Sequence, residues 1–282
     1  MNEQVTVGLT VAVVIMAAAG AVLMMDDGGS DYYVLDSLDN LAPGQVFRVD
    51  GETDTSVSVR TLTLTGVSGS NIDYDYDTGM DTKGSVPDPY NLELEDFQPY
   101  NDAVGFDYTD PDEVAASGTD VQTAVVDADT TVYTINGVFS TYEQKTFTDL
   151  RITVSGGDVT DVSGGLASSG EGYTQSRDCV TEGGVLRTSV SERTWGSASG
   201  DFTTTLMMMG VIPWSALSGQ IVTTETAGVL AGNPVTIYAC DGDQGAAGVF
   251  DDMKFYVYGD YVVKMDGKWN GNYMYSMLTV KA

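Results

Sequence analysis

The sequence predicts a mainly β protein, in which an antiparallel β-sandwich or open half-barrel ectodomain is preceded by one N-terminal hydrophobic α-helix. The 41 acidic residues comprise 31 Asp and only 10 Glu. Asp favours turns and caps, whereas Glu favours helices. The 33 glycines suit tight turns, and the segments between the turns are rich in Val and Thr, which favour strands.

The first expected element is Val5–Met25, an uncharged run of 21 residues. As a helix it spans the roughly 30 Å hydrocarbon core of a bilayer. We therefore expect residues 1–27 to be a transmembrane or anchor helix and residues 28–282 to be an extracytoplasmic β domain. A cleaved signal peptide is the main alternative, because Ala17–Ala19 and Ala19–Ala21 are small-residue cleavage sites. A helix buried inside the protein is the third.

The charge balance excludes several classes of protein. With 41 acidic against 12 basic residues, the formal net charge is −29. A nucleic-acid-binding protein needs a basic patch to replace phosphate counterions, so we predict no nucleic-acid partner. The chain contains no histidine, which removes Ser-His-Asp and Cys-His catalysis and most zinc sites. The sequence therefore predicts a protein without catalytic residues.

Acidic residues gather in the N-terminal part of the β domain. Residues 26–130 hold 24 acids and 3 bases, whereas residues 131–282 hold 16 acids and 9 bases. Strand signals are weak at about residues 70–130, and prolines are frequent there. We expect an acidic, loop-rich insertion that lies over the sheet and is partly ordered by aromatic residues. These aromatic residues are Tyr90, Phe97, Tyr100, Phe106 and Tyr108.

The C-terminal part gives the clearest strand signals. Phe255–Tyr258 and Tyr261–Lys264 are separated by Gly259 and Asp260, which predicts a hairpin with a two-residue loop. A second turn then leads to a final strand at Tyr273–Val280. Upstream, we predict four further strands and one helical turn. The strands are Gly184–Thr194, Asp201–Met209, Gln220–Thr226 and Pro234–Cys240, and the helical turn is Pro213–Leu217.

Three carboxylates at alternate positions form the clearest candidate metal site. Asp73, Asp75 and Asp77 share one face if this segment is a strand. Alternating oxygen ligands also occur in calcium loops, so Ca²⁺ is the one cofactor that the sequence suggests. Solvated turns are the alternative for this cluster and for two other acidic clusters. Those clusters comprise Asp107, Asp110, Asp112 and Glu113, and Asp241, Asp243, Asp251 and Asp252.

The two cysteines, Cys179 and Cys240, both follow the hydrophobic run. An even number of cysteines outside the cytoplasm is compatible with one disulfide, which we predict between them. Two buried thiols are the alternative. The three tryptophans, Trp195, Trp214 and Trp269, either line a ligand surface or belong to the core, and aromatic residues in strands more often pack in the core.

The order of these segments supports a resemblance. A hydrophobic span, an Asp/Gly/Ser tether at residues 26–31 and a β-rich, histidine-free domain resemble archaeal single-span surface proteins. The stretch from Gly228 to Val280, with VTIYACDG and FYVYGDYVVKMDG, is similar to periplasmic lipoprotein-carrier half-barrels, which shelter apolar ligands. Archaeal pilins share the helix-then-β plan and polymerise through the helix. This sequence lacks the basic residue that precedes the pilin cleavage site.

Together these observations predict a non-catalytic surface protein, tethered to the cell membrane through Val5–Met25, with its bulk outside the cytoplasm and a binding or structural role. One alternative is a filament subunit that self-associates through the N-terminal helix. A second alternative is a carrier or enzyme that acts on envelope lipid or glycan, with a concavity in the C-terminal sheet as its site.

Overall fold

The computed structural model describes residue 38, residues 40–87 and residues 92–282. Antiparallel strands dominate this part of the chain, so the prediction of a mainly β protein is confirmed. The predicted helix at Val5–Met25 and the anchor at residues 1–27 lie outside the described residues. Within the described ranges, every helix is too short or too polar to cross a bilayer.

The described chain forms two compact units, whereas the sequence predicted a single β domain over residues 28–282. Unit 1 contains the described residues up to Asp81 and those from Trp195 to Ala282. Unit 2 comprises Thr82–Thr194 and is therefore an insertion into unit 1. Both units are built from the same residue types, so no change in composition marks the boundary.

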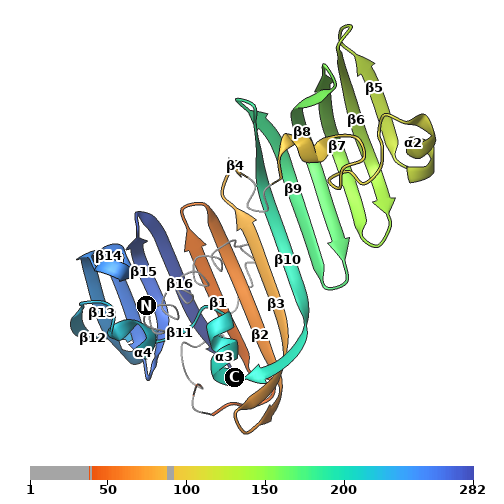
Figure 1. Cartoon of the computed structure of the whole chain (residues 1–282). Coiled ribbons are helices and arrows are strands. Elements are labelled where there is room, and N and C mark those ends of the chain that lie inside the picture. Colours follow the sequence, from red (N-terminus) through yellow and green to blue (C-terminus); the bar gives the residue numbers. More distant parts are fainter. Residues whose placement is uncertain (1–37, 39, 88–91) are drawn as a thin grey trace. The chain divides into compact units, whose positions relative to one another are not determined.

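The eight main strands of unit 1 form one antiparallel order, β12-β13-β14-β15-β16-β1-β2-β3 (Figure 1). The C-terminal strand therefore lies beside the first strand, with Lys281 opposite Val46. Short β11 pairs with β15. The bounds are β1 (Val46–Thr53), β2 (Ser56–Ser68), β3 (Asn71–Thr82), β11 (Ile212–Pro213), β12 (Thr224–Leu230), β13 (Asn233–Asp243), β14 (Val249–Tyr258), β15 (Tyr261–Trp269) and β16 (Asn272–Lys281).

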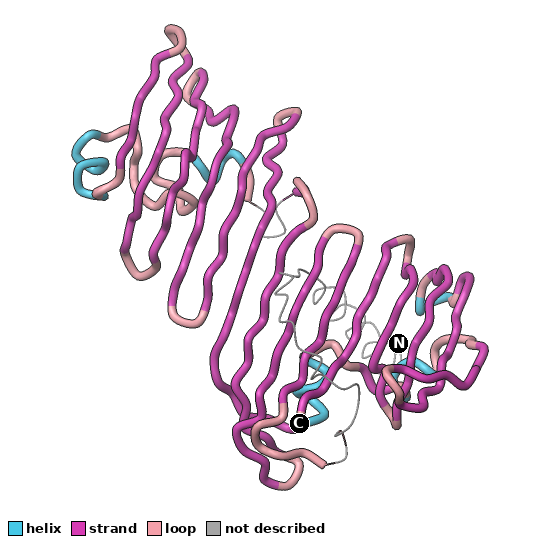
Figure 2. Tube along the Cα trace, turned by 180° about the vertical axis from the view of Figure 1, so that it is seen from behind, coloured by secondary structure: helices cyan, strands magenta, loops and turns pink. Residues whose placement is uncertain are grey.

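Short helices cover one face of the unit 1 sheet. On β1, Phe47 and Val49 are buried, whereas the intervening Arg48 is only half-buried, so alternate residues face the cover. Phe47 contacts Phe202 of α3 edge to face, with ring centroids 5.7 Å apart. Figure 2 shows these helices as short segments in the connections between long strands. Their bounds are α3 (Phe202–Met208), α4 (Ser215–Ser218) and the 3₁₀ helix η2 (Gly245–Ala247).

In unit 2 the strands are also antiparallel, and they continue the strand order after β3 as β10-β9-β8-β7-β6-β5. Each strand pairs with its neighbour in the sequence, so the sheet is a simple meander. Short β4 pairs with β10. The bounds are β4 (Val86–Pro87), η1 (Leu94–Phe97), α2 (Pro111–Ser117), β5 (Asp120–Val125), β6 (Thr130–Ser140), β7 (Gln144–Ser155), β8 (Asp158–Gly170), β9 (Tyr173–Glu182) and β10 (Val185–Asp201).

The cover segment of unit 2, defined as residues 92–118, carries η1 and α2. Phe97, Val104 and Tyr108 of this segment are fully buried against the sheet. The Tyr108 hydroxyl donates a hydrogen bond to the Phe97 carbonyl at 2.7 Å, so the segment is also tied to itself. The prediction that aromatic residues order a loop over the sheet is confirmed for these residues. Tyr100 differs, because 74% of it is exposed.

Two expected boundaries are wrong. Asn71–Thr82 is strand β3 and not part of a loop-rich insertion. The alternating Asp and Tyr residues there are a strand pattern, with the Asp side exposed and Tyr74 in the core. Asp201–Met209 was predicted to be a strand, but it contains helix α3, which Asp201 caps by accepting hydrogen bonds from the backbone N–H groups of Thr203 and Thr204.

The C-terminal strands agree with the prediction. The hairpin of β14 and β15 has the two-residue loop Gly259–Asp260, with Tyr258 opposite Tyr261. The strand predicted at Pro234–Cys240 lies within β13, and the one at Gly184–Thr194 lies almost entirely within β10. The predicted helical turn at residues 213–217 overlaps α4.

Candidate functional site

The candidate calcium ligands Asp73, Asp75 and Asp77 all lie on β3 and point to the face opposite Tyr74, as predicted. Asp75 accepts a hydrogen bond from the Ser197 hydroxyl on the unit 1 part of β10. At about 3.3 Å per residue, Asp73 and Asp77 lie roughly 13 Å apart along the strand. Calcium–oxygen distances are about 2.3–2.6 Å, so one ion cannot bind all three carboxylates in this conformation.

The second acidic cluster is hydrogen-bonded into the start of α2. Asp110 caps this helix by accepting from the Asp112 N–H at 2.8 Å. Glu113 accepts from the Asp107 N–H at 2.8 Å, and the Asp107 carboxylate accepts from the N–H and hydroxyl of Thr109 at 2.8 and 2.6 Å. In turns and at helix starts some backbone N–H groups have no backbone acceptor, and these carboxylates accept hydrogen bonds from such groups.

Asp107 is the most buried acidic group of that cluster, with 3% of the residue exposed. Burial raises the pKa of its carboxyl group, but hydrogen bonds from Thr109 and Tyr100 outweigh this effect, and the pKa is lowered overall. The ionised form of Asp107 is therefore part of the folded cover segment.

The third acidic cluster also forms local structure. Asp243 accepts from the Gly245 N–H at 2.8 Å at the start of η2, and Asp251 forms an ion pair with Lys268 at 3.5 Å. Across residues 40–87 and 92–282, no group of three or more acidic or cysteine side chains converges as a metal site would require. In both of these clusters the hydrogen bonds agree with the alternative that the carboxylates form turns and caps.

The predicted disulfide is absent from the structure. Cys179 lies on β9 in the core of unit 2, with 3% exposed, and Cys240 lies on β13 in a core cluster of unit 1, with 2% exposed. A bond between them would require a sulfur atom to leave its own core, so the alternative of two buried thiols describes the structure. Burial raises the pKa of the Cys240 thiol, which reduces its reactivity.

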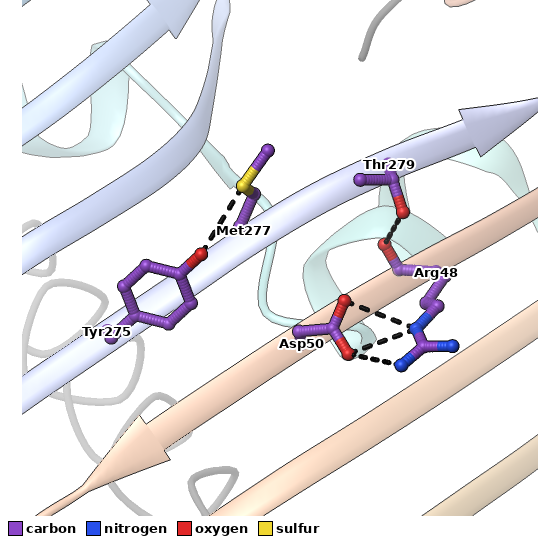
Figure 3. Close-up of polar contacts among 5 residues, drawn as sticks. All are labelled: Arg48, Asp50, Tyr275, Met277 and Thr279. Atoms are coloured by element: carbon purple, nitrogen blue, oxygen red, sulfur yellow. Dashed lines mark hydrogen bonds and ion pairs between the residues drawn. The ribbon is translucent and has the colours of Figure 1, made fainter. Parts of the chain in front are cut away.

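The open face of the unit 1 sheet, opposite the helices, carries a polar array (Figure 3). Arg48 and Asp50 are two residues apart on β1 and form a bidentate pair, with Nη2 2.8 Å from Oδ1. On the neighbouring β16, the Tyr275 hydroxyl donates to the Met277 sulfur at 3.3 Å. Thr279 donates to the Arg48 carbonyl at 3.5 Å.

The same face continues onto β14 and β15. Cross-strand pairing places Asp50 opposite Met277, Met277 opposite Lys264, and Lys264 opposite Tyr256, and residues that pair in this way share a face. The Lys264 ammonium lies 5.0 Å from the ring centre of Tyr256 and 5.3 Å from that of Tyr275, within cation–π range. We call Tyr256, Lys264, Asp266, Tyr273 and Tyr275 the tyrosine–lysine cluster.

Two hydroxyls of the tyrosine–lysine cluster have raised pKa values. Burial and then the nearby Asp266 carboxylate raise the pKa of Tyr273 to about 12. Burial and then Asp50 raise the pKa of Tyr275. At neutral pH the cluster is therefore a set of neutral aromatic hydroxyls beside fixed charges. Such a surface can stack against a flat polar ligand and hydrogen-bond its edge.

Sequence reasoning did not identify this cluster. The signals were present, because four of the cluster's five residues stand two apart in the sequence, Lys264 with Asp266 and Tyr273 with Tyr275, on strands that pair in sequence order. Only the continuation of this face to Arg48 and Asp50 depends on non-local pairing, which brings β1 beside β16 although more than 200 residues separate them. The expectation that tryptophans pack in the core holds for two of the three, since Trp214 stacks on Tyr238 and Trp269 on Phe250, both partly buried against a core cluster, whereas Trp195 is 40% exposed.

A small pocket on the covered face of unit 1 is the second candidate. Arg60 on β2 donates from Nη1 to the Met209 carbonyl at 2.9 Å, just after α3, and burial lowers the pKa of its guanidinium. Gly210 adopts φ +90°, and a Cβ atom there would lie 3.2 Å from the same Nη1. Gly51 and Ser58 also line this pocket.

The pocket is limited by its size. The pocket has a volume of about 30 Å³, which is enough for about two water molecules. Ligand pockets for lipids or glycans have about 300–1,000 Å³. The direct role of Arg60 is to satisfy a carbonyl at the C-terminal end of α3, where a cation is favourable.

Comparison of the chain with protein-family models, with curated proteins and with solved structures finds no match.

Proposed function

We propose that this chain is a non-catalytic surface protein, tethered to the cell membrane by Val5–Met25, with its β units outside the cytoplasm and a binding or structural role. The observation that carries the proposal is the uncharged 21-residue run followed directly by acidic and glycine residues. A helix satisfies its own backbone hydrogen bonds in lipid, whereas the acidic bulk of the chain cannot enter it.

The binding role is supported by the tyrosine–lysine cluster. This cluster occupies the sheet face opposite α3 and α4, where its residues are half-buried and keep part of their rings and charges exposed. The extracytoplasmic location is supported by the acidic composition. The unbridged cysteines contribute nothing to that argument, because buried thiols persist in either compartment.

Membrane fractionation tests the tether. We expect the full-length chain to sediment with membranes and to resist alkaline extraction, with residues 1–20 still present by mass spectrometry. Ile15→Arg should shift the chain toward the aqueous fraction, because a charge at the helix centre costs about 2.5–3.5 kcal/mol on insertion. Tyr142→Arg is the matched control, since Tyr142 is 93% exposed on a turn of unit 2.

Three outcomes separate the alternatives. Intact chain in the membrane supports the tether, and a soluble chain that lacks the hydrophobic run supports a signal peptide. Recovery of the intact chain only in the aqueous fraction contradicts both. Labelling of the exposed Lys268 on whole cells with a membrane-impermeant reagent tests the location, because an inward orientation would leave Lys268 unlabelled.

The first alternative is a filament subunit that self-associates through the N-terminal helix, and the exposed edge strands described below favour a filament built through the sheet edges instead. The carrier alternative requires a larger apolar cavity than the Arg60 pocket provides.

A further inference from the structure

Each unit ends in an exposed edge strand. β5 of unit 2 pairs only with β6, and β12 of unit 1 pairs only with β13, in the part of the chain that the structure describes. The outer backbone N–H and C=O groups of an edge strand are open for pairing with another strand. Side chains along both strands are mostly exposed, including Val125 at 74% and Val229 at 70%.

Neither edge carries the usual protection against pairing. Proteins blunt edge strands with lysine, proline, bulges or very short length. β5 and β12 contain no lysine and no proline, and both keep a one-to-one register with their inner neighbour. The segment Val121–Val126 is uncharged, free of glycine and rich in β-formers, which is the composition that favours strand pairing. Helix α2 lies beside only the start of β5 (Figure 1).

We propose that β5 of one copy pairs antiparallel with β12 of the next copy. This inference rests on the proposed structural role and replaces the N-terminal helix with the sheet edges as the contact between subunits. The strands match in length, with 6 and 7 residues. Setting Thr123 opposite Ala227 pairs Val121 with Val229 and places both strands in full register.

The charges fit this register. Asp120 then faces Leu230, and Glu225 faces Val125, so the only acids of the two strands lie at opposite ends. Like charges directly opposite each other would be destabilising. Because β5 and β12 are unlike edges on one chain, their pairing is heterologous and generates an open row of subunits when the rotation does not close.

Salt must control this assembly. The formal net charge of −29 makes copies repel, and screening shortens the Debye length from about 10 Å at 0.1 M to about 3 Å at 1 M. Assembly through β5 and β12 should therefore increase with sodium chloride.

Disulfide cross-linking of the full chain in detergent tests the proposal. Thr123→Cys and Ala227→Cys are prepared separately, mixed at low salt, brought to 1 M sodium chloride and oxidised. We expect a covalent heterodimer in the mixture and none in either variant alone. The double variant should give a ladder of multimers. The native Cys179 and Cys240 are buried and contribute little background.

Thr160→Cys is the matched control, because Thr160 is an exposed residue of the inner strand β8. Cross-linking of the mixture no stronger than with this control overturns the proposal, as does a dimer formed by Thr123→Cys alone, which would indicate β5–β5 pairing. The tether is measured separately by fractionation. A chain that stays in the membrane without cross-linking therefore refutes edge pairing and leaves the tether intact.

Discussion

Unit 1 and unit 2 both bury one face of an antiparallel sheet, but they cover it with different kinds of segment. In unit 1 the cover includes α3, a helix with an Asp cap and a Thr- and Met-rich sequence. In unit 2 the cover is residues 92–118, in which short helical turns alternate with irregular chain. In both units apolar side chains must cover one face of the sheet. A helix can supply these side chains, and so can a largely irregular segment.

The difference lies in how the cover is held. α3 forms helical backbone hydrogen bonds, with Asp201 accepting at its start and Arg60 donating to the Met209 carbonyl just after its end, and this segment contributes Leu206 and Met209 to the core. The cover segment of unit 2 also holds an irregular turn through side-chain hydrogen bonds, such as those accepted by Asp107 and Glu113. Carboxylates therefore support the cover of both units, at a helix start in unit 1 and also within a turn in unit 2.

The largest effect should come from removing an aromatic side chain of the unit 2 cover. Phe97 is 0% exposed, so Phe97→Ala should destabilise unit 2 by about 3–5 kcal/mol through lost burial and a cavity. Amide hydrogen exchange followed by mass spectrometry should show loss of protection in β6–β8 and not in β1–β2. Glu95→Ala in the same segment is the control, and it should stay within about 0.5 kcal/mol because Glu95 is exposed. Equal effects of the two substitutions would mean that Phe97 does not anchor the cover.

The matched experiment in unit 1 uses two neighbours on α3. Leu206 is 1% exposed and Met208 is 62% exposed. Leu206→Ala should cost about 2–5 kcal/mol, whereas Met208→Ala should be nearly neutral. Hydrogen exchange should now report loss of protection in β1–β2. If Leu206→Ala loosened both units equally, the two units would unfold as one cooperative body.

Local patterns in the sequence were enough to predict parts of both units. The β14–β15 hairpin follows from Gly259 and Asp260 between two alternating runs, and the buried aromatic residues of the cover follow from their loop context. The strand at residues 71–82 was missed because dense Asp suggested a loop. Its alternation with Tyr74 and Tyr76 carried the opposite, correct signal.

The remaining differences arise from tertiary structure. Helix α3 lies in a segment whose Thr and Phe residues favour strands, and its cap by Asp201 and the burial of Leu206 decide the outcome. The continuation of the tyrosine–lysine cluster to Arg48 and Asp50 depends on the pairing of β1 with β16, and the division into two units depends on where the chain leaves and rejoins unit 1. Neither is encoded in a local pattern.

Acid should act first on unit 2. The pKa of Asp107 is lowered in the folded state, so its contribution to stability is present above the unfolded value of about 3.9 and is lost as pH falls through the folded value. Urea unfolding across this range should show a steeper loss for the native chain than for Asp107→Asn. Identical pH profiles would mean that the hydrogen bonds from Thr109 do not favour the ionised form.

Alkali should act on unit 1. The pKa of Tyr273 is raised to about 12 in the folded state, and an unfolded tyrosine titrates near 10. The neutral hydroxyl therefore contributes stability that is complete below about pH 10 and is lost as pH rises toward 12. Tyr273→Phe should flatten the alkaline limb of the stability profile. The control Tyr142→Phe, on an exposed turn of unit 2, should leave that limb unchanged.

The smallest expected effect concerns calcium and the Asp row on β3. A specific site would add about 2.7 kcal/mol at a hundredfold excess of calcium over its dissociation constant. We expect sodium and calcium to stabilise the chain equally at matched ionic strength, because Asp73 and Asp77 are roughly 13 Å apart and only relief of repulsion is available to them. Thermal unfolding of the native chain and of the triple variant Asp73→Asn, Asp75→Asn, Asp77→Asn measures this. A calcium-specific rise in Tm that the triple variant lacks would show that β3 bends to form a site.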